Sequence, residues 1–133
     1  MGLALLDAWS LKKNLSFIVV DPNQYKKINL KNNIRIKSYD NISKIKKFFL
    51  IDIVIFAIKP QISDSVLKDI SNIKFNKNVI FVSIIAGKKI NSFNKFLTNK
   101  NKFVRVMPNM PAMINQGMTC LVANKNILQK EKK

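Results

Sequence analysis

A glycine at the start of the chain and an aspartate 19 residues later form the first pair whose types and spacing could do chemistry. Gly2 precedes an apolar helical stretch, and Asp21 directly follows the β-branched run SFIVV. In dinucleotide-binding βαβ units, a glycine lets the helix pack closely on the strand, and an acid about 20 residues on binds the adenosine ribose. Ordinary turn chemistry explains the pair equally well, because helices often start after Gly and Asp-Pro-Asn is a common turn sequence.

Three later segments place small residues and Pro directly after runs of strand length. They are AIKPQ at 57–61, SIIAGK at 83–88 and RVMPNMPA at 105–112. If the runs are parallel strands, all three segments lie at carboxyl ends, the edge of an open α/β sheet where ligands bind. For any one segment alone, an ordinary loop that begins with Pro or Gly is the simpler interpretation.

The elements that position these residues alternate between strands and helices. Apolar runs at 16–20, 51–58, 79–85 and 103–107 are typical of strands covered on both faces, and 33–37 alternates like a strand nearer the edge. Helical spacing occurs at 3–13, after Gln61 and, more briefly, at 44–49 and 92–97. The pattern predicts an α/β fold with a doubly wound, Rossmann-like parallel sheet. Such a fold usually begins with a central strand, whereas this chain opens with a helix, so we expect the first central strand to be lacking.

Composition excludes several kinds of chemistry. The chain has 133 residues, no His and a single Cys, so we expect no metal site, no disulfide and no His-dependent nucleophile. Its net charge of +17 indicates, as an alternative function, a small basic nucleic-acid-binding module. However, 22 of the 24 basic residues are Lys, and they are scattered along the chain. A nucleic-acid surface would use more Arg, so we favour a solvated Lys-rich surface.

No stretch of the sequence is typical of membrane insertion or export. The start, MGLALLDAW, lacks a basic region, and the most apolar stretch, 48–58, is short and contains Asp52. We therefore expect a cytoplasmic location.

Five strings resemble the N-terminal cofactor-binding domain of the pyrroline-5-carboxylate reductases. They are MGLALLDAW at 1–9, VVDP at 19–22, DIVIFAIKPQ at 52–61, VSIIAGK at 82–88 and VRVMPNMPAMINQGMT at 104–119. The last string is the most specific, and prephenate dehydrogenases are among the nearest confusions. The resemblance implies a reductase that transfers a hydride from NADH or NADPH to 1-pyrroline-5-carboxylate, giving L-proline.

The resemblance also implies which residues bind the cofactor, and it assigns no catalytic residue. Asp21 would meet the adenosine ribose, and a carboxylate there favours NADH slightly over NADPH because it repels a 2′-phosphate. The implied cofactor-binding residues are Met1 and Gly2 at the tail of the Gly-rich turn, Asp21, Asn41, Ala57, Ile58, Lys59 and Pro60, Ala86 and Gly87 beside the nicotinamide ribose, and Asn109 near the nicotinamide.

Two parts of the family pattern have no counterpart in the sequence. The family's first strand and the first two glycines of its Gly-rich turn are missing. The family's C-terminal helical domain, which forms the dimer and much of the imine site, is missing as well. We therefore expect residues 1–133 to be a single, incomplete dinucleotide-binding domain, truncated at both ends and inactive by itself. An imine substrate and a homo-oligomer are expected only with the missing domain.

Overall fold

The structure is a computed structural model that describes residues 1–29, 35–98, 100–109, 111, 114 and 116–131. Contacts divide the chain into two compact units, Met1–Lys47 and Phe48–Lys133. None of the described helices combines the length and apolar character needed to cross a bilayer. The expectation of a single domain over residues 1–133 stays a prediction.

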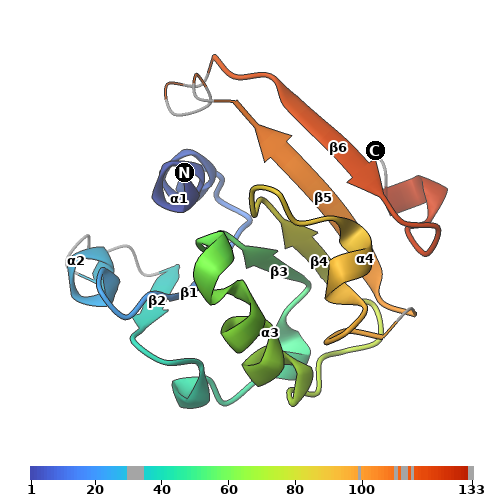
Figure 1. Cartoon of the computed structure of the whole chain (residues 1–133). Coiled ribbons are helices and arrows are strands. Elements are labelled where there is room, and N and C mark those ends of the chain that lie inside the picture. Colours follow the sequence, from blue (N-terminus) through green and yellow to red (C-terminus); the bar gives the residue numbers. More distant parts are fainter. Residues whose placement is uncertain (30–34, 99, 110, 112–113, 115, 132–133) are drawn as a thin grey trace. The chain divides into compact units, whose positions relative to one another are not determined.

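The first unit is a helix followed by a small parallel sheet (Figure 1). Its elements are α1 (Gly2–Ser10), β1 (Phe17–Val20), α2 (Tyr25–Asn29), β2 (Ile36–Tyr39) and the 3-10 turn η1 (Ile42–Lys44). β1 and β2 pair in parallel, from Phe17 opposite Ile36 to Val20 opposite Tyr39. The Arg35 guanidinium donates to the carbonyls of Ser10, at 3.0 Å, and Lys12, so it satisfies carbonyls at the end of α1.

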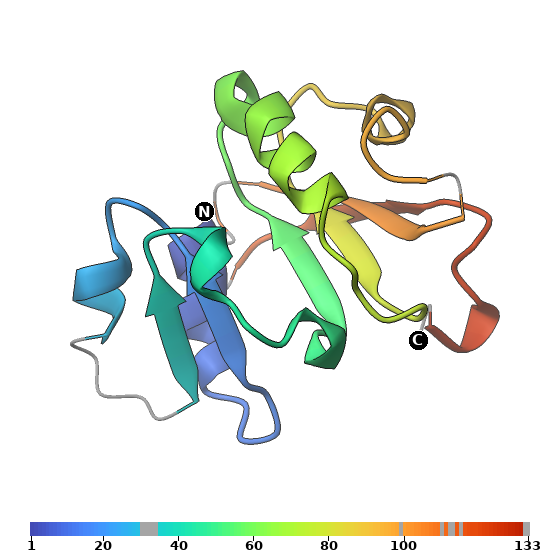
Figure 2. The same cartoon turned by 90° about the horizontal axis from the view of Figure 1, so that it is seen from below.

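The second unit is a four-stranded sheet with helices. Its elements are η2 (Phe48–Leu50), β3 (Ile53–Phe56), η3 (Pro60–Ile62), α3 (Ser63–Ser71), β4 (Ile80–Ser83), α4 (Ile90–Phe93), β5 (Lys102–Pro108), β6 (Thr119–Ala123) and η5 (Gln129–Glu131). The strand order is β3-β4-β5-β6, in which the first three strands are parallel and β6 is antiparallel to β5. Figure 2 shows α3 and α4 on the same side of this sheet.

Aromatic side chains form the core between the sheet and these helices. The ring centroid of Phe56 lies 6.1 Å from that of Phe81 and 5.9 Å from that of Phe93, and both ring pairs are stacked. The ring centroids of Phe93 and Phe103 are 4.4 Å apart. All four rings are at most 3% exposed, and Leu67 of α3 is fully buried. This packing fixes the carboxyl ends of β3, β4 and β5 relative to the starts of α3 and α4.

Most of the predicted elements are confirmed, and five details are wrong. The helix predicted at 92–97 is observed as α4 at Ile90–Phe93. The strand predicted at 33–37 is observed at Ile36–Tyr39, and residues 33 and 34 lie outside the described residues. The helix predicted at 44–49 is replaced by the turns η1 and η2, because the backbone at Ile45 is extended (φ −84°, ψ 124°). Two observed elements, α2 and β6, were not expected from the sequence.

Strands β1 and β3 each have one unpaired edge. They belong to different sheets, and within the described part of the chain each pairs with one neighbour only. In a doubly wound sheet of strand order 3-2-1-4-5-6, these two strands correspond to the neighbours of the first central strand. The observed orders β1-β2 and β3-β4-β5 agree with that arrangement.

Candidate cofactor-binding site

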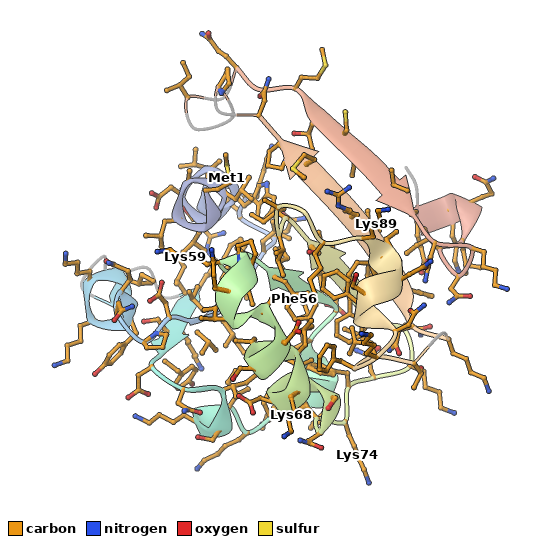
Figure 3. The ribbon with its side chains drawn as sticks, viewed as in Figure 1. Met1, Phe56, Lys59, Lys68, Lys74 and Lys89 are labelled. Atoms are coloured by element: carbon orange, nitrogen blue, oxygen red, sulfur yellow. The ribbon has the colours of Figure 1, made fainter. Side chains whose placement is uncertain are left out.

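The parallel register of the second unit places three candidate segments along one edge of the sheet. Phe56, Ser83 and Arg105 lie opposite one another, so the chain leaves β3 and β4 at the same level. β5 continues three residues further, to Pro108. In Figure 3, Lys59 and Lys89 lie at the end of the unit where α3 and α4 begin, and Lys68 and Lys74 lie at the opposite end. This is the edge at which an open α/β sheet binds ligands.

The segment after β3 is an exposed turn with a defined start. Ala57, Lys59 and Pro60 are exposed and Ile58 is half-buried. Lys59 has an extended backbone (φ −68°, ψ 145°), and Pro60 occupies the first position of η3, where its missing N–H costs nothing. Three of the four predicted binding residues are therefore accessible to a ligand.

The segment after β4 combines a buried anchor with two small exposed residues. Ile85 is 1% exposed, and its N–H donates to the buried Ser83 hydroxyl at 3.2 Å. Ala86 and Gly87 follow and are exposed. Gly87 has φ +72°, the left-handed region, and a Cβ built there would meet no protein atom within 4 Å. The space beside the Gly87 backbone is therefore open to an approaching group.

Asn109 stabilises the connection that follows β5. Its Oδ1 accepts from the N–H of Met118 at 2.9 Å, and its own N–H donates to the Met118 carbonyl at 3.2 Å. These two bonds close the connection from β5 to β6. The side chain is exposed, so its amide nitrogen remains accessible.

In the first unit, two predicted residues follow adjacent strands. Asp21 comes directly after β1, and its Oδ1 accepts from the N–H groups of Asn23 (2.9 Å) and Gln24 (3.0 Å). No hydrogen bond to its Oδ2 is found within the described ranges, so this oxygen fits a ribose hydroxyl. Asn41 follows β2 by two residues, and its Oδ1 accepts from the N–H of Ser43 at 2.9 Å.

The charged groups next to Asn41 form a local ion pair. Lys44 Nζ donates to the carboxylate of Asp40 at 2.8 Å, and this hydrogen bond lowers the Asp40 pKa from its ordinary value of 3.8. Burial opposes the shift but is the smaller effect. The lysine is therefore engaged with Asp40 and contributes little free positive charge to the candidate site.

Met1 and Gly2 mark the beginning of α1. Met1 is the N-cap and makes no side-chain capping bond, and its carbonyl accepts from the Leu5 N–H at 3.1 Å. The first N–H groups of a helix have no intrahelical partner, and such groups favour anions. A phosphate-binding role for these two residues stays a prediction.

The structure thus brings the eleven candidates into local groups. Ala57–Pro60, Ala86, Gly87 and Asn109 follow three neighbouring strands of one sheet, and Asp21 and Asn41 follow two neighbouring strands of the other. A single site containing all eleven stays a prediction. The sequence analysis gave no role to Lys88, which contacts Ser63 and Asp64.

The strand order, the parallel register and the strand-end loops define a Rossmann-like α/β protein. Comparison of folds agrees with this class. A pyrroline-5-carboxylate reductase from Coxiella burnetii matches 98% of this chain and 48% of its own length, with a TM-score of 0.79 and 22% identity. The enzyme from Streptococcus pyogenes matches 99% of this chain and 48% of its own length, with a TM-score of 0.76 and 24% identity.

Sequence comparison names the family. The pyrroline-5-carboxylate reductase of Haemophilus influenzae is 34% identical over 82% of this chain and 39% of its own length. The Aquifex aeolicus enzyme is 31% identical over 99% of this chain and 48% of its own length. No family model matches the chain.

The chain is a homologue of the pyrroline-5-carboxylate reductases, and the resemblance seen in its sequence is confirmed. It spans about half the length of the curated relatives it matches. The predicted fold class is confirmed as well.

Proposed function

We propose that this chain supplies the nicotinamide-dinucleotide-binding part of an oxidoreductase that reduces 1-pyrroline-5-carboxylate to L-proline. The observation that carries the proposal is the 31% identity with the Aquifex aeolicus reductase over 132 residues, which includes all three strand-end segments. A reductase structure from Plasmodium falciparum, with 24% identity and a TM-score of 0.63, was solved with NADP bound.

A nicotinamide dinucleotide, when bound, supplies the hydride, so the chain's own residues have to bind and orient it. Asp21 Oδ2 is available to accept from a ribose hydroxyl, while Oδ1 holds the turn into α2. Ala86 and the open backbone at Gly87 would lie beside the nicotinamide ribose, and the exposed Lys59 would supply positive charge to the phosphates. Orientation by such groups is a large part of the catalysis of hydride transfer.

The carboxylate of Asp21 supports a preference for NADH over NADPH. A negatively charged side chain accepts bonds from the 2′-hydroxyl and repels a 2′-phosphate. Lys26 and Lys27 lie nearby in α2 and reduce that repulsion, so we propose a modest preference. By itself the chain is proposed to bind the cofactor weakly and to be inactive.

Saturation-transfer NMR with NADH tests the proposal, because the method detects weak binding. Asp21→Asn keeps an oxygen for the turn into α2 but removes the charge. Asp69→Asn, at an exposed site on α3, is the matched control. We expect Asp21→Asn to weaken NADH binding roughly tenfold or more and NADPH binding less, because hydrogen bonds to a charged group are lost. Absence of transfer to both nucleotides from the unaltered chain would refute the proposed binding role.

Cytoplasmic location and assembly with an imine-binding, oligomer-forming domain remain part of the proposal. The alternative of a nucleic-acid-binding module still depends only on the +17 charge. Binding to an RNA or DNA fragment with a steep salt dependence would revive that alternative.

A further inference from the structure

Lys88 is a mostly buried lysine that joins two loops of the second unit. Its ammonium donates to the Ser63 hydroxyl at 2.6 Å and to the Asp64 carboxylate, and its side chain is only 14% exposed. The rings of Phe93 and Phe96 flank it, with their centroids 5.8 and 5.9 Å from Nζ. A buried ammonium needs such partners, because desolvation disfavours an unpaired charge.

The Ser63 hydroxyl extends this connection to the neighbouring loop. Ser63 is 1% exposed, and it donates to the carbonyl of Pro60 at 2.7 Å while accepting from Lys88. A continuous path of hydrogen bonds therefore runs from Lys88 through Ser63 to Pro60. Its two ends lie in the segments that follow β3 and β4, both of which contain candidate cofactor-binding residues.

Because Lys88 directly follows the loop residues Ala86 and Gly87, the hydrogen-bond path restricts the conformation of that loop. Gly87 has a φ of +72°, which makes this the most permissive point of the loop. Fixing the next side chain to α3 restricts the conformations open to Ala86 and Gly87. Lys89, one residue further, is exposed and makes no side-chain hydrogen bond within the described part of the chain.

We propose that Lys88 is a positioning residue, which holds the Ala86–Gly87 loop and the Lys59–Pro60 turn in one fixed arrangement for the bound dinucleotide. This inference rests on the proposed function, and the polar contacts of the Lys88 ammonium are with Ser63 and Asp64. The hydrogen bond from Lys88 also lowers the pKa of Asp64 from its ordinary value of 3.8, so the Asp64 carboxylate stays charged at neutral pH. No relation between the two loops is visible from the sequence, because Lys88 and Ser63 lie 25 positions apart.

The test compares Lys88→Met with Lys89→Met, which removes the same charge from the adjacent exposed site. Amide hydrogen exchange without nucleotide is measured first. We expect Lys88→Met to speed exchange about tenfold or more in both 57–62 and 85–89 while β4 and β5 keep their protection. Lys89→Met should leave both segments unchanged, and Lys88→Arg should restore part of the protection because it keeps a donor.

NADH binding is measured next on the same proteins. We expect Lys88→Met to weaken it about tenfold relative to Lys89→Met, because the two loops no longer keep one arrangement. If exchange rises only in 85–89, or rises equally everywhere, Lys88 is merely structural and the proposal fails. If the unaltered chain binds no nucleotide, the proposed function fails, while the exchange result still decides whether Lys88 couples the loops.

A second variant covers the case in which Lys88→Met does not fold. Ser63→Ala removes the connection to Pro60 but keeps the ion pair between Lys88 and Asp64. We expect it to speed exchange in 57–62 and to leave 85–89 nearly unchanged. Unaltered exchange in 57–62 would overturn the proposal.

Discussion

Gly87 offers a clean test of how the loop after β4 is built. Its φ of +72° lies in the left-handed region, and a Cβ at this position would meet no atom within 4 Å. A substitution therefore changes backbone preference without adding crowding. At most buried glycines a substitution changes both backbone preference and packing, whereas at Gly87 it changes backbone preference alone.

The magnitude follows from that geometry. An L-residue other than Gly, Asn or Asp pays roughly 1–2 kcal/mol for a left-handed conformation. Gly87→Ala also restricts the unfolded chain, which returns about 0.4–1 kcal/mol. We expect a net loss of about 1 kcal/mol in the free energy of unfolding. Asn tolerates this region better, so Gly87→Asn should lose less, and the β-branched Gly87→Val should lose more.

Urea unfolding followed by circular dichroism in dilute protein measures the series. The expected order of stability is Gly, Asn, Ala, Val from most to least stable. A loss above about 3 kcal/mol for Ala would mean that the Cβ meets something, because conformation alone does not cost so much. A stabilising Ala would mean that the loop does not hold φ at +72°.

Three further predictions concern the remaining contacts of the second unit. Asn124→Ala should lower the free energy of unfolding by about 2 kcal/mol in urea titrations, because its side chain makes three hydrogen bonds to backbone groups, whereas Asn91→Ala at an exposed site should change little. The hydrogen bond from Lys102 lowers the pKa of Glu131 below its ordinary 4.5. The contact between Lys102 and Glu131 should therefore give its full contribution to stability above pH 4.5, and this contribution should fall as the pH drops through the lowered pKa. Melting curves of Glu131→Gln should not show this pH dependence. The edge of β3 that is unpaired within the described residues can recruit other strands, so we expect the chain to associate and Ile55→Lys to reduce its light scattering; unchanged scattering would show that this edge is not the cause.

The sequence predicted those elements whose own residues determine them. β3 and β4 are apolar β-branched runs, and α3 repeats its apolar residues at helical spacing, ending in the buried Leu67 and Ile70. Their Pro and Gly residues mark the loops that follow. These signals are local, so the strand-end segments could be predicted as well.

The missed elements depend on partners far away in the sequence. All five residues of β6 are exposed, so no alternation of buried and exposed residues identifies the strand, and only its pairing with β5 defines it. The contact of Lys88 with Ser63 is likewise a tertiary event. α2 lacks an apolar stripe, and the Asp21 carboxylate at its start is what favours it.

Within the described residues β1 and β3 each have one unpaired edge, and the geometry of parallel pairing determines which residues face it. The N–H groups of Phe17 and Asp21 donate to the carbonyls of Arg35 and Tyr39, so in β1 the odd-numbered residues face the partner strand. The backbone groups of Ile18 therefore point to the unpaired edge, and the same alternation applies to Ile55, because the carbonyls of Asp52 and Phe56 accept from β4.

These edge-facing residues are also the ones with exposed aliphatic side chains, at 44% for Ile18 and 38% for Ile55. Parallel strands are normally covered on both faces, and their apolar sequences reflect that environment. Each edge thus combines unpaired backbone groups with an uncovered aliphatic face. A further strand that pairs in parallel would satisfy the backbone groups, and only an element covering the same face would remove the exposed aliphatic surface.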